Sequence, residues 1–345
     1  MRIAKKERGN RMASNLHFLI QSNVPQQVSY YKSNFGPLKA VVRLNGYPHA
    51  VQTEILTAVV DMAAAENTPA QIIHHCMDNS LQGVILPEIQ AGVYGSDIYA
   101  PDEFSYLASF DPEMVQTIQK DLKTAGETMV QARKIHDAQE KIYINNMDFA
   151  KADRLADQMC EKLLKGRGKR NPACAVHRFF GAATVQGNIN YIPQLTQDLA
   201  KRYFIKGRPG TGKSTYLKKI AKTVLAHGYD VEIYHCSFDP NSLDMIVVRE
   251  LDVCLFDSTA PHEYFPTLPA DEVVDLYALC VTPGTDETYS DELSNLEKKY
   301  KEMVQLGMES VHNAKQTVDA FDHALPKLDA TQIKVIQNSI IKQIF

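Results

Sequence analysis

The stretch Lys206-Gly-Arg-Pro-Gly-Thr-Gly-Lys-Ser-Thr215 decides the fold. Residues 207–214 satisfy the pattern G-x-x-x-x-G-K-[ST]. Its glycines let the chain curl closely and adopt positive φ, so that backbone N–H groups point inward as an anion nest. In such a loop Lys213 places an ammonium on the β- and γ-phosphates, and Ser214 offers its hydroxyl to Mg²⁺. The pattern therefore predicts a phosphate-binding loop, or P-loop.

The flanking segments are those that a P-loop requires. Residues 202–206 are typical of a short β-strand, and residues 214–227 are typical of a helix that Gly228 ends. The N-terminus of that helix would direct its partial positive charge at the phosphates. Because no Asn-Lys-x-Asp guanine signature is present, we expect ATP rather than GTP, with Mg²⁺. The predicted nucleotide-binding residues are Gly207, Arg208, Pro209, Gly210, Thr211, Gly212, Lys213, Ser214 and Thr215.

A second element is the apolar run at residues 251–257, which ends in an aspartate. It predicts a buried strand with a carboxylate at its carboxyl end, where parallel α/β sheets bind their ligands. Asp257 is therefore predicted to hold Mg²⁺ through a water, together with Ser214. The alternative is an aspartate that caps the next turn.

Two polar loops near this edge supply further candidates. A strand at residues 231–236 is followed by a loop at residues 237–244, in which Asp239 and Asp244 could position a nucleophilic water or accept a proton. Capping of a turn is the alternative for Asp239. The pair His235-Cys236 also occurs in the first half of the chain, which favours a structural role for both residues.

The loop after Asp257 contains His262, which could sense the γ-phosphate or be a solvated loop histidine. No glutamate directly follows Asp257, so Glu263 is a candidate for the base that polarises water. The candidate catalytic residues are Lys213, Asp239, Asp244, Asp257, His262 and Glu263.

The chain also contains an internal repeat, whose matches recur at a nearly constant offset along the sequence. It predicts an α/β protein of two tandem P-loop NTPase-like domains, each with a mostly parallel, doubly wound sheet. The matching stretches are 45–48 with 206–209, 75–81 with 235–243, and 100–104 with 260–264.

The two copies differ at the phosphate loop. Gln52 stands where the second copy has Lys213, and His49 and Val51 replace two glycines. The counterpart of Asp257 is Gly95 or Asp97, depending on the offset, and His262 corresponds to Asp102. We therefore expect a first copy that keeps the framework and has lost the phosphate loop.

Each copy ends in a long, polar-rich helical stretch. The first runs from about Pro112 to about Leu164 with a possible break near Asn145, and the second from about Asp286 to Leu325. We expect these arms to pack on each other or on the sheets; self-association or a protein partner bound as a coiled coil is the alternative. The predicted domains are 1–164 and 174–345, joined by a basic linker at 165–173.

The composition is that of an ordinary soluble chain of 345 residues, with 44% apolar and 23% charged residues and a net charge of −4. This charge argues against a broad nucleic-acid or membrane-binding surface. The six cysteines form no C-x-x-C pair, and we find neither a secretory signal nor a membrane span. We therefore expect a cytoplasmic protein.

Several stretches together resemble an uncharacterised bacterial family of tandem P-loop ATP-binding proteins. They are residues 206–215, His235-Cys236 with residues 239–244, residues 256–262, His177-Arg-Phe-Phe-Gly-Ala182, and Lys141-Ile-Tyr-Ile144 with Met147-Asp-Phe149. The resemblance implies a duplicated P-loop NTPase fold and ATP binding. Members of the family tend to have a P-loop in the first copy too, from which residues 46–53 of this chain depart.

Three functions use the same loop. They are an ATPase whose hydrolysis drives a change between the copies, a non-catalytic nucleotide sensor with the first copy as a docking surface, and a kinase for a small molecule. The region after Asp257 is poor in the arginines that a kinase lid uses, and the long arms favour conformational coupling or partner binding. We therefore expect an ATPase first, a sensor second and a kinase third.

Overall fold

The computed structural model describes residues 15–22, 28–95, 111–170, 172–325 and 328–345. The first half of the molecule contains β1 (Leu16–Leu19), α1 (Tyr31–Phe35), β2 (Ala40–Leu44), α2 (His49–Ala65), β3 (Gln71–His74), β4 (Leu81–Leu86) and β5 (Ala91–Gly95). The second half contains β6 (Ala175–Phe179), β7 (Gly181–Thr184), β8 (Gly187–Asn190), α6 (Ile192–Thr196), β9 (Lys201–Lys206), α7 (Lys213–Ala226), β10 (Val231–His235), β11 (Leu243–Val248), β12 (Val253–Asp257), β13 (Glu272–Asp275) and α8 (Leu276–Cys280).

The described strands other than the β7–β8 hairpin form one large sheet, so the protein is α/β. The strand order is the same in both halves: β1-β3-β4-β5-β2 in the first, and β6-β10-β11-β12-β9 in the second, which β13 extends at the edge. The halves meet where Leu19 of β1 pairs with Phe179 of β6. Corresponding strands begin at nearly constant offsets along the chain, which agrees with the sequence matches.

The sheet as a whole is mixed, but within each half the strands other than the middle one run in the same direction, as the prediction of a mostly parallel sheet requires. In each half the middle strand, β4 or β11, is antiparallel to both of its neighbours. The connections on either side of β11 span only residues 236–242 and 249–252. They are too short for the crossover that joins parallel strands. Asp244, expected in a loop, belongs to β11.

The elements around the phosphate loop and the helical arms are confirmed. Strands β9, β10 and β12 and helix α7 lie where the sequence predicts them. The first arm consists of α4 (Pro112–Asn145) and α5 (Phe149–Leu164), so the break falls near Asn145 as expected. Asp111 and Asp148 begin these helices because their carboxylates accept hydrogen bonds from free N–H groups of the first turns. The second arm, expected from about Asp286 to Leu325, consists of α9 (Thr285–Thr288) and α10 (Ser290–Ala324). Helix α11 (Ala330–Ile344) follows it and was not predicted.

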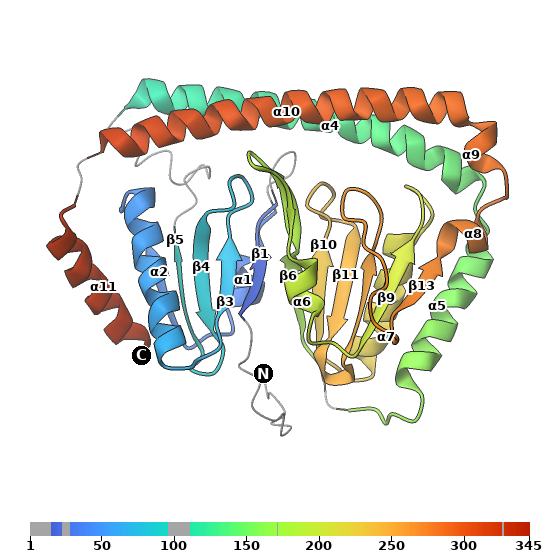
Figure 1. Cartoon of the computed structure of the whole chain (residues 1–345), viewed down its shortest axis with the longest axis horizontal. Coiled ribbons are helices and arrows are strands. Elements are labelled where there is room, and N and C mark those ends of the chain that lie inside the picture. The colour runs from blue at the N-terminus through green and yellow to red at the C-terminus, as the bar shows by residue number, and fades with distance from the viewer. Residues whose placement is uncertain (1–14, 23–27, 96–110, 171, 326–327) are drawn as a thin grey trace.

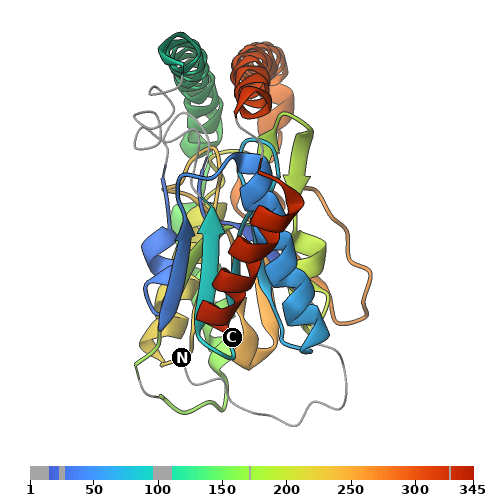
Figure 2. The same cartoon turned by 90° about the vertical axis from the view of Figure 1, so that its left-hand side faces the viewer.

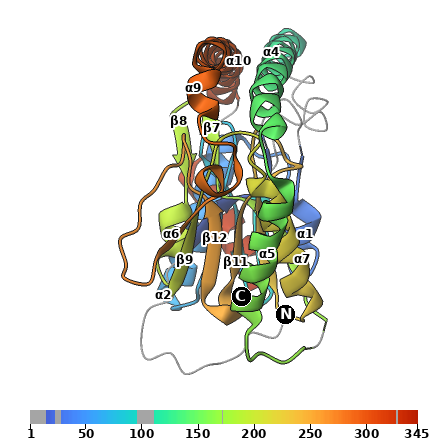
Figure 3. The ribbon, with the colours of Figure 1, turned by 90° about the vertical axis from the view of Figure 1, so that its right-hand side faces the viewer.

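The arms exchange helices between the halves. Helices α4 and α10 lie side by side over one edge of the sheet (Figure 1). Helix α5, which follows the first half in sequence, packs on α7 of the second half (Figure 3). Helix α11, at the end of the chain, packs on α2 of the first half (Figure 2). Each half is therefore completed by a helix that follows the other half.

The long arm helices repeat each other in sequence. Residues 127–142 match residues 309–324 at several charged and small positions. The buried seam follows the same alignment: Ala125, Met129 and Ala132 of α4 correspond to Gly307, Val311 and Ala314 of α10. A Cβ at Gly307 would lie 2.8 Å from Met129 Cε, so the helices approach closely at this point. Among the described helices, none combines the length and hydrophobicity needed to cross a bilayer.

A histidine pair lies in each half beside the centre of the sheet. His17 Nδ1 is 2.9 Å from His74 Nε2, and His177 Nδ1 is 2.8 Å from His235 Nε2. This geometry equates His235 with His74, whereas the sequence match had paired it with the next residue. A tyrosine of the opposite half contacts each pair: Tyr191 stacks on His17 and His74, and the Tyr30 ring lies tilted against His177 and His235. Since both halves keep the arrangement, it serves the junction between them.

The histidine pairs predict a specific pH dependence of stability. Burial lowers the pKa of His74 to about 4, below its ordinary value of 6.5. Between these values the unfolded chain binds a proton that the folded protein does not, so this histidine stabilises the fold less as the pH falls from 6.5 to 4. The variant His74→Gln cannot be protonated. In urea unfolding, its deficit in stability relative to the wild type is expected to shrink over this pH range. A constant deficit would contradict the prediction.

Candidate nucleotide-binding site

The loop between β9 and α7 contains glycines in the left-handed conformation, as predicted for a phosphate-binding loop. Gly210 and Gly212 have φ of +76° and +79°, the left-handed region that favours glycine. Gly207 is needed for another reason, because a Cβ there would collide with Thr211 Oγ1. Thr211 Oγ1 in turn donates to the Arg208 carbonyl at 2.8 Å, which tightens the turn. The glycines therefore occupy positions where other residues would strain the loop.

Lys213 and Ser214 begin α7 directly after the loop. The Lys213 ammonium donates to the carbonyl oxygen of Arg208 at 2.9 Å and lies 3.6 Å from Asp257 Oδ2. The Ser214 hydroxyl accepts a hydrogen bond of 2.9 Å from the backbone N–H of Leu243, the first residue of β11. The structure thus brings Lys213, Ser214 and Asp257 together at one edge of the sheet.

Asp244 completes an acidic pair with Asp257. The register of β11 and β12 pairs Met245 with Phe256, which places Asp244 directly opposite Asp257. Both residues are buried, with 9% and 8% of their surface exposed. Burial and the neighbouring Asp257 carboxylate raise the pKa of Asp244 to about 7. Two opposed carboxylates repel each other unless a proton or a cation lies between them.

His262 also lies near this group. Its ring meets the ring of Phe180 edge-on, with centroids 5.0 Å apart. Burial lowers the pKa of His262, with a smaller opposing effect from Asp257 and a lowering one from Lys213. His262 is thus within electrostatic range of both charges. Its counterpart Asp102 and the alternative residue Asp97 lie outside the described residues.

Two candidate acids are held in ion pairs with other residues. Asp239 Oδ1 lies 2.9 Å from an Arg133 guanidinium nitrogen, and Asp239 Oδ2 accepts a hydrogen bond from Ser242. The Glu263 carboxylate accepts a 2.7 Å hydrogen bond from Lys206 and is about half exposed. Because Arg133 belongs to α4, Asp239 serves to dock the first arm.

The remaining loop residues lie toward solvent or toward the second arm. Arg208 is exposed, pairs with Asp286 at 2.8 Å and lies over the ring of Tyr277. The Asp286 carboxylate also accepts a hydrogen bond from Tyr143 of the first arm. Pro209 is half-buried and Thr215 is exposed on α7. The loop is therefore anchored to both arms through Asp286.

The first half shows the same site without its charges. The Gln52 side chain donates to the Tyr47 carbonyl at 2.7 Å, as Lys213 does to Arg208. The strand register makes Gly95 the counterpart of Asp257, and a Cβ at Gly95 would lie 2.5 Å from Gln52 Oε1. Gln82, opposite Gly95, takes the place of Asp244. The three charges are therefore absent together.

In the first half, a carboxylate of the second arm lies at the N-terminus of the helix that corresponds to α7. Helix α2 begins at His49, the counterpart of Gly210, because no glycine interrupts it there. The backbone N–H groups of His49 and Ala50 donate to the Asp322 carboxylate of α10 at 2.8 and 3.0 Å. A carboxylate is favoured at a helix N-terminus for the same reason as a phosphate. The second arm thus caps helix α2 of the first half through the Asp322 carboxylate.

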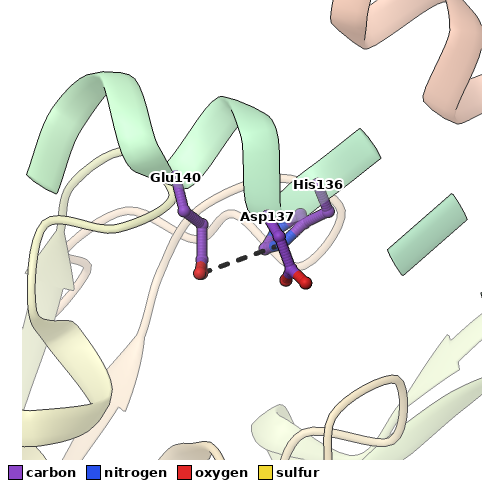
Figure 4. A group of neighbouring side chains, drawn as sticks. All are labelled: His136, Asp137 and Glu140. Atoms are coloured by element: carbon purple, nitrogen blue, oxygen red, sulfur yellow. Dashed lines mark ion pairs between the residues drawn. The ribbon is translucent and has the colours of Figure 1, made fainter. Parts of the chain in front are cut away.

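The first arm passes over the loop at residues 207–212 of the second half, a contact that the sequence does not predict. A Cβ at Gly210 would collide with the carbonyl oxygen of Glu140 on α4. Beside it, the ligand atoms of His136, Asp137 and Glu140 lie within 4.8 Å of one another (Figure 4). Asp137 is bound by Arg133, so this trio is already partly neutralised. The match between residues 127–142 and residues 309–324 could have indicated that His136, Asp137 and Glu140 lie at a similar place in the first arm as their counterparts do in the second.

Compared with known protein families, curated proteins and solved structures, the chain matches none.

Proposed function

We propose that the second half binds ATP with Mg²⁺ through the loop at residues 207–214 and hydrolyses it. In this proposal the two halves are tandem P-loop NTPase-like domains, and the first is a pseudo-domain. The observation that carries it is the concerted difference between the halves. Lys213, Asp244 and Asp257 meet at one sheet edge, whereas the same positions of the first half hold neutral residues. These positions differ together between the halves, which supports a shared role in binding phosphate and Mg²⁺.

The residues fit a magnesium ion. Mg²⁺ prefers oxygen ligands, and Ser214, Asp244 and Asp257 offer a hydroxyl and two carboxylates at one place. The opposed carboxylates would gain from a divalent cation between them, because it removes their repulsion. When bound, Mg²⁺ would neutralise phosphate charge. Lys213 would supply the ammonium for the phosphates, and the amides of the loop would wrap them.

The first arm contacts the nucleotide-binding loop, so a change in the loop on hydrolysis would act on the arm. The first arm touches the phosphate loop through Glu140 and the neighbouring loop through Arg133. It then continues into α5, which packs on α7 directly behind the loop. A change in the loop would therefore reach the arm that joins the two halves. This supports an ATPase that drives a conformational change.

A non-catalytic nucleotide sensor is the second candidate. Ser258 follows Asp257 where a water-activating glutamate would be expected, and Glu263 is paired with Lys206. Both observations favour slow hydrolysis of ATP. A protein that hydrolyses ATP slowly keeps its nucleotide bound for long, as a sensor requires.

Phosphate release by the full-length protein tests these candidates. The whole chain is required because each half is covered by a helix that follows the other. We expect ATP- and Mg²⁺-dependent release of phosphate without any acceptor. Binding without release would support the sensor, and release only as phosphoryl transferred to an acceptor would support a kinase. A protein that binds no nucleotide in the presence of Mg²⁺ would exclude all three.

A further inference from the structure

The two long arm helices differ at one position that lies near the phosphate loop, where one has a polar residue and the other an apolar one. In the alignment of residues 127–142 with residues 309–324, His136 of α4 corresponds to Val318 of α10. Val318 is buried, with 5% of its surface exposed, and belongs to the apolar core beneath the arms. The neighbouring charged positions are matched instead: Arg133 with Lys315, Asp137 with Asp319, and Glu140 with Asp322.

The matched charges dock the arms. Arg133 pairs with Asp239 at 2.9 Å, and its counterpart Lys315 lies 3.6 Å from Asp78, the counterpart of Asp239. Both basic residues also pair with the acid one turn further along their helix. Because the half without the loop charges keeps these contacts, they serve the packing of the arms. The position that corresponds to His136 in the other arm holds the apolar Val318. The histidine is therefore present only in the arm that passes over the half with Lys213, Asp244 and Asp257.

His136 is a polar residue at the position where the other arm has a valine. Its Nδ1 is buried and has no hydrogen-bond partner within the part of the chain that the structure describes. The Glu140 carboxylate is 3.7 Å away, and the rings of Phe238 and Tyr300 flank the imidazole. A buried polar atom left without a partner costs stability, so its presence calls for a ligand or another explanation.

The position of His136 points to the phosphate site. It lies one turn before Glu140, whose backbone touches Gly210 (Figure 4). Burial lowers the pKa of His136, as do the charges of Arg133 and Lys213, against raising effects of Asp137 and Asp239. The ring is therefore within electrostatic range of the P-loop lysine and neutral at physiological pH. A neutral imidazole donates from one nitrogen and accepts at the other, so it can hydrogen-bond an anion.

We propose that His136, supplied by the arm of the first half, hydrogen-bonds the terminal phosphate of the nucleotide held by residues 207–214. The inference rests on the proposed function and deepens it. It makes the site a composite of both halves. It also makes His136 a specificity-determining residue that distinguishes a triphosphate from a diphosphate, and it links the arm to the presence of the γ-phosphate.

Titration of the full-length protein with ATP and with ADP, each with Mg²⁺, tests this inference. The variant His136→Val copies the other arm and should fold. Its affinity for ATP is expected to fall about tenfold or more, as for the loss of a hydrogen bond to a charged group, while its affinity for ADP stays within about twofold. His136→Asn, which keeps a polar atom near the position of Nδ1, should restore most of the affinity for ATP.

The ratio of the two affinities separates a role in recognition from a role in packing. Val318→Ala disturbs the equivalent position of the other arm and should leave the ratio unchanged. If His136→Val weakens ATP and ADP equally, or neither, the inference is overturned while the nucleotide site stands. If the wild type binds neither nucleotide, the proposed function fails and this inference fails with it.

Discussion

Replacing Lys213 by glutamine is expected to weaken nucleotide binding at least about 100-fold, as for the loss of charge-assisted hydrogen bonds to phosphates. The first half already contains this substitution as Gln52, which makes the same hydrogen bond to the preceding loop as Lys213 does. The variant should therefore keep the packing of the loop and lose only the charge. Fluorescence titration with an ATP analogue in the presence of Mg²⁺ measures the effect.

A second lysine of the same helix provides the matched control. Lys222 is exposed on α7, away from the loop, and Lys222→Gln makes the same change of charge. It should bind nucleotide as the wild type does. Thermal unfolding should show that both variants are folded. Wild-type affinity in a folded Lys213→Gln protein would remove the loop at residues 207–214 as the nucleotide site.

The elements around the loop were predictable because their signals are local. The β9 strand, the glycines and the apolar face of α7 follow one another without interruption in the sequence, so periodicity and spacing suffice. The break in the first arm was predictable for the same reason, since polar residues interrupt the helical pattern near Asn145. In these segments, local propensity and the final structure agree.

The exchange of helices and the composite site could not be predicted in this way. The contact between Glu140 and Gly210, and that between His49 and Asp322, join residues that are far apart in the sequence. Neither contact leaves a periodic pattern. The antiparallel course of β11 was also hidden, because a fully buried strand does not show its direction in the sequence. The strand register, in contrast, settles a question that the sequence left open by making Gly95 the counterpart of Asp257.

Asp244→Asn is expected to raise the Mg²⁺ concentration needed for half-maximal ATP binding by about tenfold or more, because affinity for a divalent cation follows the number of ligand charges. The asparagine keeps the shape of the side chain opposite Asp257 and removes one carboxylate. Titration of Mg²⁺ at fixed ATP concentration measures the shift. Asp137→Asn removes a carboxylate from the arm above the site, which Arg133 already holds, and should leave the magnesium dependence nearly unchanged.

The same variant has a second, independent consequence for stability without metal. The pKa of Asp244 is raised from 3.8 to about 7, so between these values the folded protein holds a proton that the unfolded chain has released. Stability due to this group therefore falls as the pH rises from about 4 to about 7, and an asparagine at this position carries no such penalty. In urea unfolding with a metal chelator, Asp244→Asn should gain stability relative to the wild type as the pH rises to about 8. A loss of stability at that pH would contradict a raised pKa of Asp244, and the argument for a cation between the two carboxylates would lose this support.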